Sequence, residues 1–120
     1  MFEITLDRNY PRKLSQACVQ ITELLGLYQA ELARILHLQC GDIGRLANGQ
    51  WCLEPDSQAW RQAQLFVGFY QRLYAHMAGD PVAMVHWLRV RHEGLDATPH
   101  HMMVDDDSLE EVLAWFGSPA

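Results

Sequence analysis

The 120-residue sequence has few cysteines, and no two of them lie close together in the chain. They are Cys18, Cys40 and Cys52, so any disulfide would leave one cysteine unpaired. This cysteine content is typical of proteins in a reducing cytosol. The first ten residues lack the basic start and apolar stretch of a signal peptide. No later segment approaches the roughly 18 consecutive apolar residues of a membrane-spanning helix. We therefore expect a soluble, cytoplasmic protein that has no membrane contact.

The sequence also lacks the short motifs that carry most catalytic and metal chemistry. It has six histidines but no CxxC or HExxH spacing, and no glycine-rich phosphate-binding loop. His37 lies three residues before Cys40, but no orienting group or oxyanion site is indicated for a thiol nucleophile. The three aspartates at 105 to 107 are more typical of a solvated helix start than of a magnesium site. The sequence therefore predicts no enzyme, metal or cofactor.

Apolar residues are plentiful, and charge is unevenly distributed. The chain is 49% hydrophobic and 20% charged, which suits one compact fold or two very small ones. The formal net charge is −6, but residues 11–50 carry four basic and three acidic side chains. Residues 51–120 carry four basic side chains against ten acidic ones. We therefore expect the two halves to meet different partners.

Helical spacing of apolar residues runs through the whole chain, and no segment alternates as a strand would. The sequence therefore predicts an all-α fold, in which a helix-turn-helix bundle over residues 11–52 packs against a helical region over residues 56–117. Stop and cap signals such as Gly26, Asp80-Pro81 and Thr98-Pro99 separate the helices. The expected helices cover residues 12–25, 29–36, 40–47, about 57–78, 81–90, 100–104 and 109–116.

The longest predicted helix begins at a cap supplied by Asp56 or Ser57. One broad stripe of this helix is aromatic and apolar, which favours packing between the two halves or across a dimer. The stripe consists of Trp60, Ala63, Val67, Tyr70, Tyr74 and Met77.

Residues 25–50 have the layout of a helix-turn-helix. Small Ala33 lies where the two helices would cross, and Ile43 and Leu46 would hold the second helix against the first. The pattern resembles the DNA-binding domain of phage repressors and Xre regulators. The residues that carry this resemblance are Leu25-Gly26-Leu27, Gln29 to Ala33, Ile43, Leu46 and Asn48-Gly49.

The resemblance implies a set of contacts to double-stranded operator DNA. Gln29 would lie beside a phosphate, and Gln39, Cys40, Gly41 and Arg45 would face the major groove. Arg45 is the strongest candidate for a base contact, because a guanidinium matches the two acceptors on a guanine edge. The alternative is a helix-turn-helix kept only for packing or dimerisation.

The second half resembles the C-terminal toxin-binding domain of Xre/MbcA/ParS antitoxins. The matching residues are Ala83, Trp87-Leu88, Leu95, Thr98-Pro99, Met103, Val112 and Leu113. The resemblance implies a type II antitoxin that neutralises its cognate toxin and, as a homodimer, represses their shared operon. Toxins paired with this family are frequently RES-domain enzymes that consume NAD, or relatives that transfer ADP-ribose.

Acidic and large apolar side chains at the end of the chain suit a basic cleft on a toxin. Complementary charges speed the association of two proteins, and aromatic side chains anchor the centre of an interface. One alternative is that Trp115 and Phe116 only complete the core. At the level of function, the alternatives are a free-standing helix-turn-helix regulator that dimerises without a toxin, and a protein-interaction module with a degenerate recognition helix. The predicted toxin-binding residues are Met102, Met103, Asp105, Asp106, Trp115 and Phe116.

Overall fold

The computed structural model describes residues 11–117, and over this range the regular secondary structure is helical apart from one isolated bridge between His92 and Ala97. This confirms the all-α prediction. None of the described helices combines the length and the apolar character that crossing a bilayer requires. The seven helices are α1 (Pro11–Leu24), α2 (Gln29–Leu36), α3 (Cys40–Ala47), α4 (Gln58–His76), α5 (Pro81–Arg89), α6 (Pro99–Val104) and α7 (Leu109–Gly117).

Local capping contacts explain where several helices begin. The Ser57 hydroxyl accepts the backbone N–H of Trp60 at 3.1 Å, so Ser57 is the cap of α4. Asp80 and Thr98 cap α5 and α6 in the same way, and a proline follows each of them at the first helical position. These signals lie within a few residues of the helix ends. The helix boundaries expected from the sequence therefore mostly lie within two residues of the observed ones.

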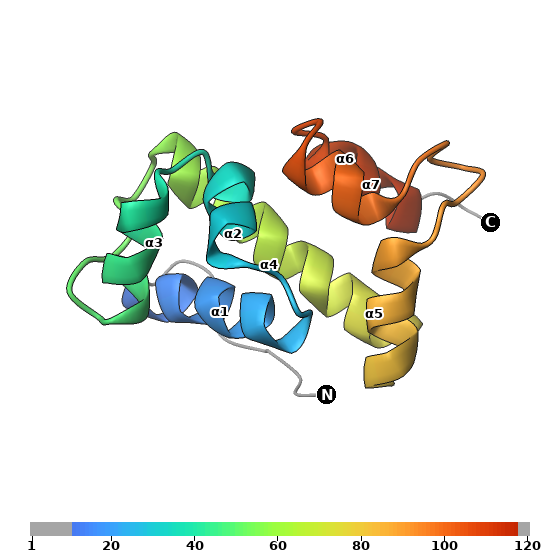
Figure 1. Cartoon of the computed structure of the whole chain (residues 1–120), viewed down its shortest axis with the longest axis horizontal. Helices are drawn as coiled ribbons and strands as arrows, with labels where there is room; N and C mark the ends of the chain where they lie inside the picture. The colour runs from blue at the N-terminus through green and yellow to red at the C-terminus, as the bar shows by residue number, and fades with distance from the viewer. Residues whose placement is uncertain (1–10, 118–120) are drawn as a thin grey trace.

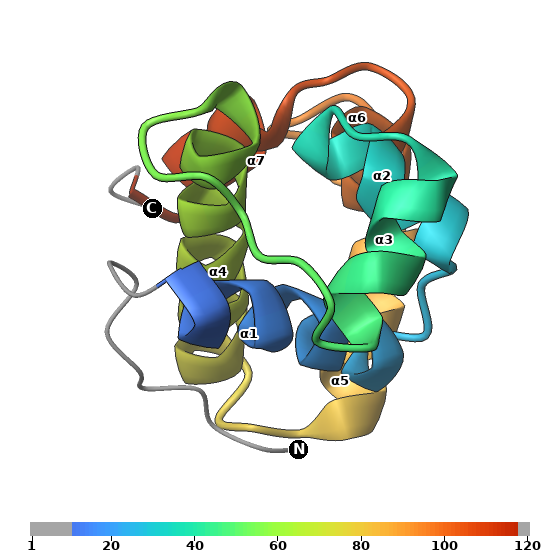
Figure 2. The same cartoon turned by 90° about the vertical axis from the view of Figure 1, so that its left-hand side faces the viewer.

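Helices α1, α2 and α3 form a three-helix unit at one end of the molecule (Figure 1). The long helix α4 runs through the middle and packs against α1 and α2 on one side and α7 on the other. Helix α6 lies against α2, α5 and α7. Helix α3 packs mainly against α1 and α2, so it remains at the end of the fold, where Figure 2 views it directly.

The buried surface of α4 is wider than the single predicted stripe. Tyr74 and Met77 of that stripe are only partly buried. Phe66, Phe69 and Leu73, outside the stripe, are fully buried. Because α4 is covered on opposite sides, one continuous apolar core extends from α1 to α7 and joins the two predicted regions.

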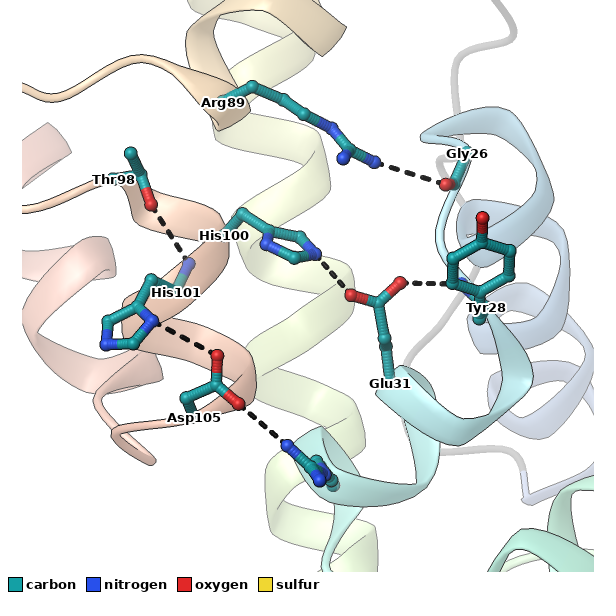
Figure 3. Close-up of polar contacts among 9 residues, drawn as sticks. Gly26, Tyr28, Glu31, Arg89, Thr98, His100, His101 and Asp105 are labelled. Carbon is teal, nitrogen blue, oxygen red and sulfur yellow. Dashed lines mark hydrogen bonds and ion pairs between the residues drawn. The ribbon is translucent and has the colours of Figure 1, made fainter.

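Polar contacts tie α2 and the turns at its ends to α5, α6 and the loop after α6, and we call this set the seam (Figure 3). Arg34 pairs with Asp105 at 2.7 Å, and His100 pairs with Glu31. The Arg89 guanidinium donates to the carbonyl of Gly26 at 3.3 Å. The exposed Arg34–Asp105 pair stabilises the fold by about 0–1 kcal/mol, so it orients α6 on α2 more than it stabilises the protein. The His100–Glu31 contact is partly buried.

Candidate functional site

Helix α3 presents one face to the core and the other to solvent. Ile43 and Leu46 are buried against the rest of the three-helix unit. Gln39, at the N-cap of α3, is exposed, as are Cys40, Gly41 and Arg45. The spacing of three between Ile43 and Leu46 keeps both on one side of the helix, which leaves the opposite side open to solvent. The four residues predicted to face a DNA groove are thus accessible together at one end of the molecule.

Gln29 occupies the first position of α2 and is also exposed. The Glu31 carboxylate accepts the backbone N–H of Tyr28 at 2.9 Å, so it caps the start of this helix and adds negative charge there. The same arrangement recurs at α3, where Asp42 accepts the backbone N–H of Gln39 at 3.2 Å. Each motif helix therefore carries a carboxylate in its first turn.

Arg45 is held by two neighbours that the sequence analysis did not pair with it. Its Nη2 group donates to Oδ1 of Asp42, and its guanidinium carbon lies 5.6 Å from the centre of the Trp51 ring. The hydrogen bonds from Arg45 and from the backbone of Gln39 lower the pKa of Asp42, so this carboxylate is ionised at neutral pH. The i, i+3 spacing of Asp42 and Arg45 was the available signal for this pair.

Trp51 is positioned by the N-terminal part of α1. The Ser15 hydroxyl accepts the buried backbone N–H of Leu53 at 3.0 Å and donates to the carbonyl of Pro11 at 2.7 Å. This contact fastens the segment after α3 to α1. A shallow hollow at this junction is lined by Trp51 together with Arg12, Ser15, Gln16, Leu46, Gly49 and Cys52. Arg12 therefore adds a second exposed cation beside the end of α3.

Replacing Ser15 with alanine is expected to reduce the free energy of unfolding by about 1–3 kcal/mol, because it leaves the buried Leu53 N–H without its acceptor. Urea denaturation of the two proteins measures the change. Gln16→Ala, at the adjacent exposed position, is the matched control and should change stability by less than about 0.5 kcal/mol. Equal stability of Ser15→Ala and the wild type would contradict this anchoring role.

Met102 and Met103, which were predicted to bind a toxin, do not lie on the surface. Their side chains are 5% and 1% exposed, because α6 is covered by α2, α5 and α7. Neither side chain is therefore available to a partner in this fold. Trp115 and Phe116 are half-buried and lie over Trp87, with ring centres 5.5 Å and 4.9 Å from it. They pack against the core, as the alternative interpretation held.

Asp105 and Asp106 are exposed, in agreement with the sequence analysis, but they have contacts within the chain. Asp105 pairs with Arg34, and His101 lies 3.1 Å from Asp105 and 3.5 Å from Asp106. Near them is an open polar hollow of about 300 Å³ between the starts of α4 and α7. Its lining residues are His37, Gln58, Gln62, Asp107, Ser108, Leu109, Glu110 and Glu111.

The cysteines differ in accessibility, and this gives a direct chemical test of the fold. Cys18 is buried, and burial raises the pKa of its thiol, whereas Cys40 is exposed on α3. We expect a thiol-alkylating reagent to modify Cys40 well before Cys18 in the folded protein, with the sites assigned by peptide mass spectrometry. Unfolding in urea should equalise the two rates. Modification of Cys18 as fast as Cys40 in the folded chain would contradict this packing.

Within residues 11–117, no three histidine, cysteine, aspartate or glutamate side chains converge on a point where a metal ion would fit. The described residues form an exposed helix face that carries Arg45 on the three-helix unit. They also form an acidic surface over the loop after α6 and the start of α7. Comparison of the sequence with protein-family profiles finds no matching family, and comparison with curated proteins finds no match.

Proposed function

We propose that this chain is a DNA-binding transcriptional repressor that inserts α3 into the major groove. The observation that carries the proposal is the position of α3 at one end of the molecule, with Ile43 and Leu46 facing inwards and Arg45 facing solvent. The major groove of B-DNA is about 12 Å wide and accepts one α-helix. Gln29, at the exposed start of α2, would contact a phosphate.

Cys40 provides a test at the level of a single side chain. If α3 lies in the groove, duplex DNA should protect Cys40 from alkylation, because the groove walls cover the exposed start of the helix. The alkylation rate of Cys40 in the free protein is the reference. The affinity should also fall steeply between 50 and 200 mM salt, as phosphate contacts release counterions. Binding that leaves Cys40 fully reactive would refute insertion of α3.

We further propose that the chain is the antitoxin of a type II toxin–antitoxin pair, as its resemblance to the Xre/MbcA/ParS family implies. The support in the structure is the exposed acidic surface at the loop after α6, which includes Asp105, Asp106 and the hollow at the start of α7. Such a surface suits the basic, anion-binding cleft of a toxin that consumes NAD, such as a RES-domain enzyme. Trp115 and Phe116, which are half-buried, would lie at the edge of that contact.

Copurification from the native host, followed by mass spectrometry of any bound chain, tests this second proposal. A toxin bound to the wild type should be lost from the double variant Asp106→Lys, Glu110→Lys. Both positions are exposed, so the substitutions leave α7 in place. A reading frame for a toxin next to this one would also support the proposal. The alternative, a free-standing repressor that dimerises and has no toxin, predicts a homodimer in light scattering with no second chain bound.

A further inference from the structure

We propose that Asp42 and Trp51 are positioning residues, which hold the guanidinium of Arg45 in place so that the protein selects sites containing guanine over duplex DNA in general. This inference rests on the DNA-binding function proposed above.

Two contacts from different directions restrain the arginine. Nη2 of Arg45 donates to Oδ1 of Asp42, one turn earlier on the same helix. The guanidinium also lies over the Trp51 ring, 5.6 Å from its centre. A guanidinium has five N–H donors, so the bond through Nη2 leaves donors for the two acceptors on a guanine edge.

Both restraining side chains are themselves fixed. The second oxygen of Asp42 accepts the backbone N–H of Gln39 at 3.2 Å, which ties this carboxylate to the start of α3. Trp51 lies in the hollow between α1 and the end of α3, and the contact from Ser15 to Leu53 holds its segment there. The restraints on Arg45 therefore extend into the backbone and into α1.

This arrangement has two physical consequences for binding. An unrestrained arginine loses much of its rotamer freedom when it contacts a base, whereas a restrained one has already lost it, so the specific contact forms at a smaller entropic cost. The ionised carboxylate of Asp42 also opposes the approach of phosphates, so it weakens contacts that carry no sequence information. Asp42 should therefore lower the affinity for all duplexes while raising the discrimination between them.

These opposite effects distinguish a positioning role from simple charge repulsion. A preferred duplex is first selected from a random pool with the wild-type chain, and its dissociation constant is compared with that of duplexes in which each guanine is replaced. Asp42→Asn keeps an oxygen that can accept the Gln39 N–H but loses the charge. We expect it to bind every duplex more tightly and to lose about 10-fold of the preference for the guanine site.

Glu31→Gln is the matched control, because Glu31 holds the same capping position in α2. Its carboxylate contacts Tyr28 and His100 rather than an arginine of α3. It removes the same unit of charge and should preserve the preference. Trp51→Leu should reduce the preference without tightening the binding of other duplexes, and Trp51→Phe, which keeps an aromatic face, should restore it. Thermal melting of each variant confirms that it is folded.

A measurement on the free protein separates failure of this inference from failure of the proposed function. NMR relaxation of the Arg45 Nε–H group should show a restrained side chain in the wild type and a more mobile one in Asp42→Asn. An equally mobile Arg45 in both proteins overturns the inference, as does an Asp42→Asn variant with undiminished preference for the guanine site. If the wild type binds no duplex even at low salt, the proposed function fails, and the inference fails with it.

Discussion

Phe69→Ala is expected to lower the free energy of unfolding by about 3–5 kcal/mol, the largest effect of any change considered for this protein. Phe69 is fully buried on α4 and lies between Phe66, Trp87 and Phe116, with ring centres 6.5, 6.0 and 6.1 Å away. Removing the ring leaves a cavity. Its neighbours belong to three different helices, so they cannot all move inwards to fill it. Domains of this size are stabilised by about 5–15 kcal/mol, so the loss is a large fraction of the total.

Urea denaturation followed by far-ultraviolet circular dichroism measures this effect. Val82→Ala is the control, because Val82 is 77% exposed and its replacement should change stability by less than about 0.5 kcal/mol. The slope of the unfolding free energy with urea should be similar in both variants if the chain unfolds as one unit. A loss below about 1 kcal/mol for Phe69→Ala would mean that the aromatic cluster does not hold α5 and α7 against α4.

Arg45→Ala is expected to have the largest effect on DNA recognition. It should reduce the preference for the selected site by about 10- to 100-fold, or about 1–3 kcal/mol, because it removes the proposed bidentate contact to guanine. Stability should change little, because Arg45 is exposed and its pair with Asp42 is at the surface. Dissociation constants for the selected duplex and its guanine-replaced counterpart give the change in preference.

Arg12→Ala is the matched control for charge. Arg12 is exposed beside Trp51 at the start of α1, and the proposed binding mode assigns it a phosphate contact rather than a base contact. We expect this change to weaken binding of all duplexes equally and to reduce the slope of affinity with salt by about one unit. Loss of the same preference in both variants would indicate that Arg45 contributes charge alone.

The structure also decides how a partner surface can be tested. Deleting residues 105–120 would remove the acidic surface, but it would also remove α7, whose Leu109 and Val112 are buried in the core. If the truncated chain failed to neutralise a toxin, the cause could therefore be either unfolding of the chain or loss of the contact between the acidic surface and the toxin. Substitutions at exposed positions such as Asp106 avoid this ambiguity.

The helices were predictable because their signals are local. The expected and observed bounds of α2 and α3 agree, and the caps of α4, α5 and α6 each lie one residue before the helix. An N-cap accepts a backbone N–H two or three residues further along the chain, so its effect can be read within a short window of sequence. Periodicity also placed Ile43 and Leu46 on the inner face of α3.

The candidate site was predicted in part. Sequence reasoning identified Arg45 but not the side chains that restrain it. Asp42 was three residues away, whereas the placement of Trp51 depends on Ser15, which is 36 residues earlier in the chain. No local pattern relates a serine on α1 to a loop that follows α3. The prediction for Met102 and Met103 failed because their burial depends on how α2, α5 and α7 pack around α6, which the local sequence does not contain.

The sequence by itself determined an all-α chain, the positions of its helices and the inner face of α3, because hydrogen bonds within a helix, caps and periodicity act over a few residues. Only the tertiary structure decided that α4 is covered on two sides, that Met102 and Met103 belong to the core, and that Arg45 is held between Asp42 and Trp51. These features depend on which helices pack together. Packing is set by complementary shape and the burial of apolar area across the whole chain, which no short segment contains.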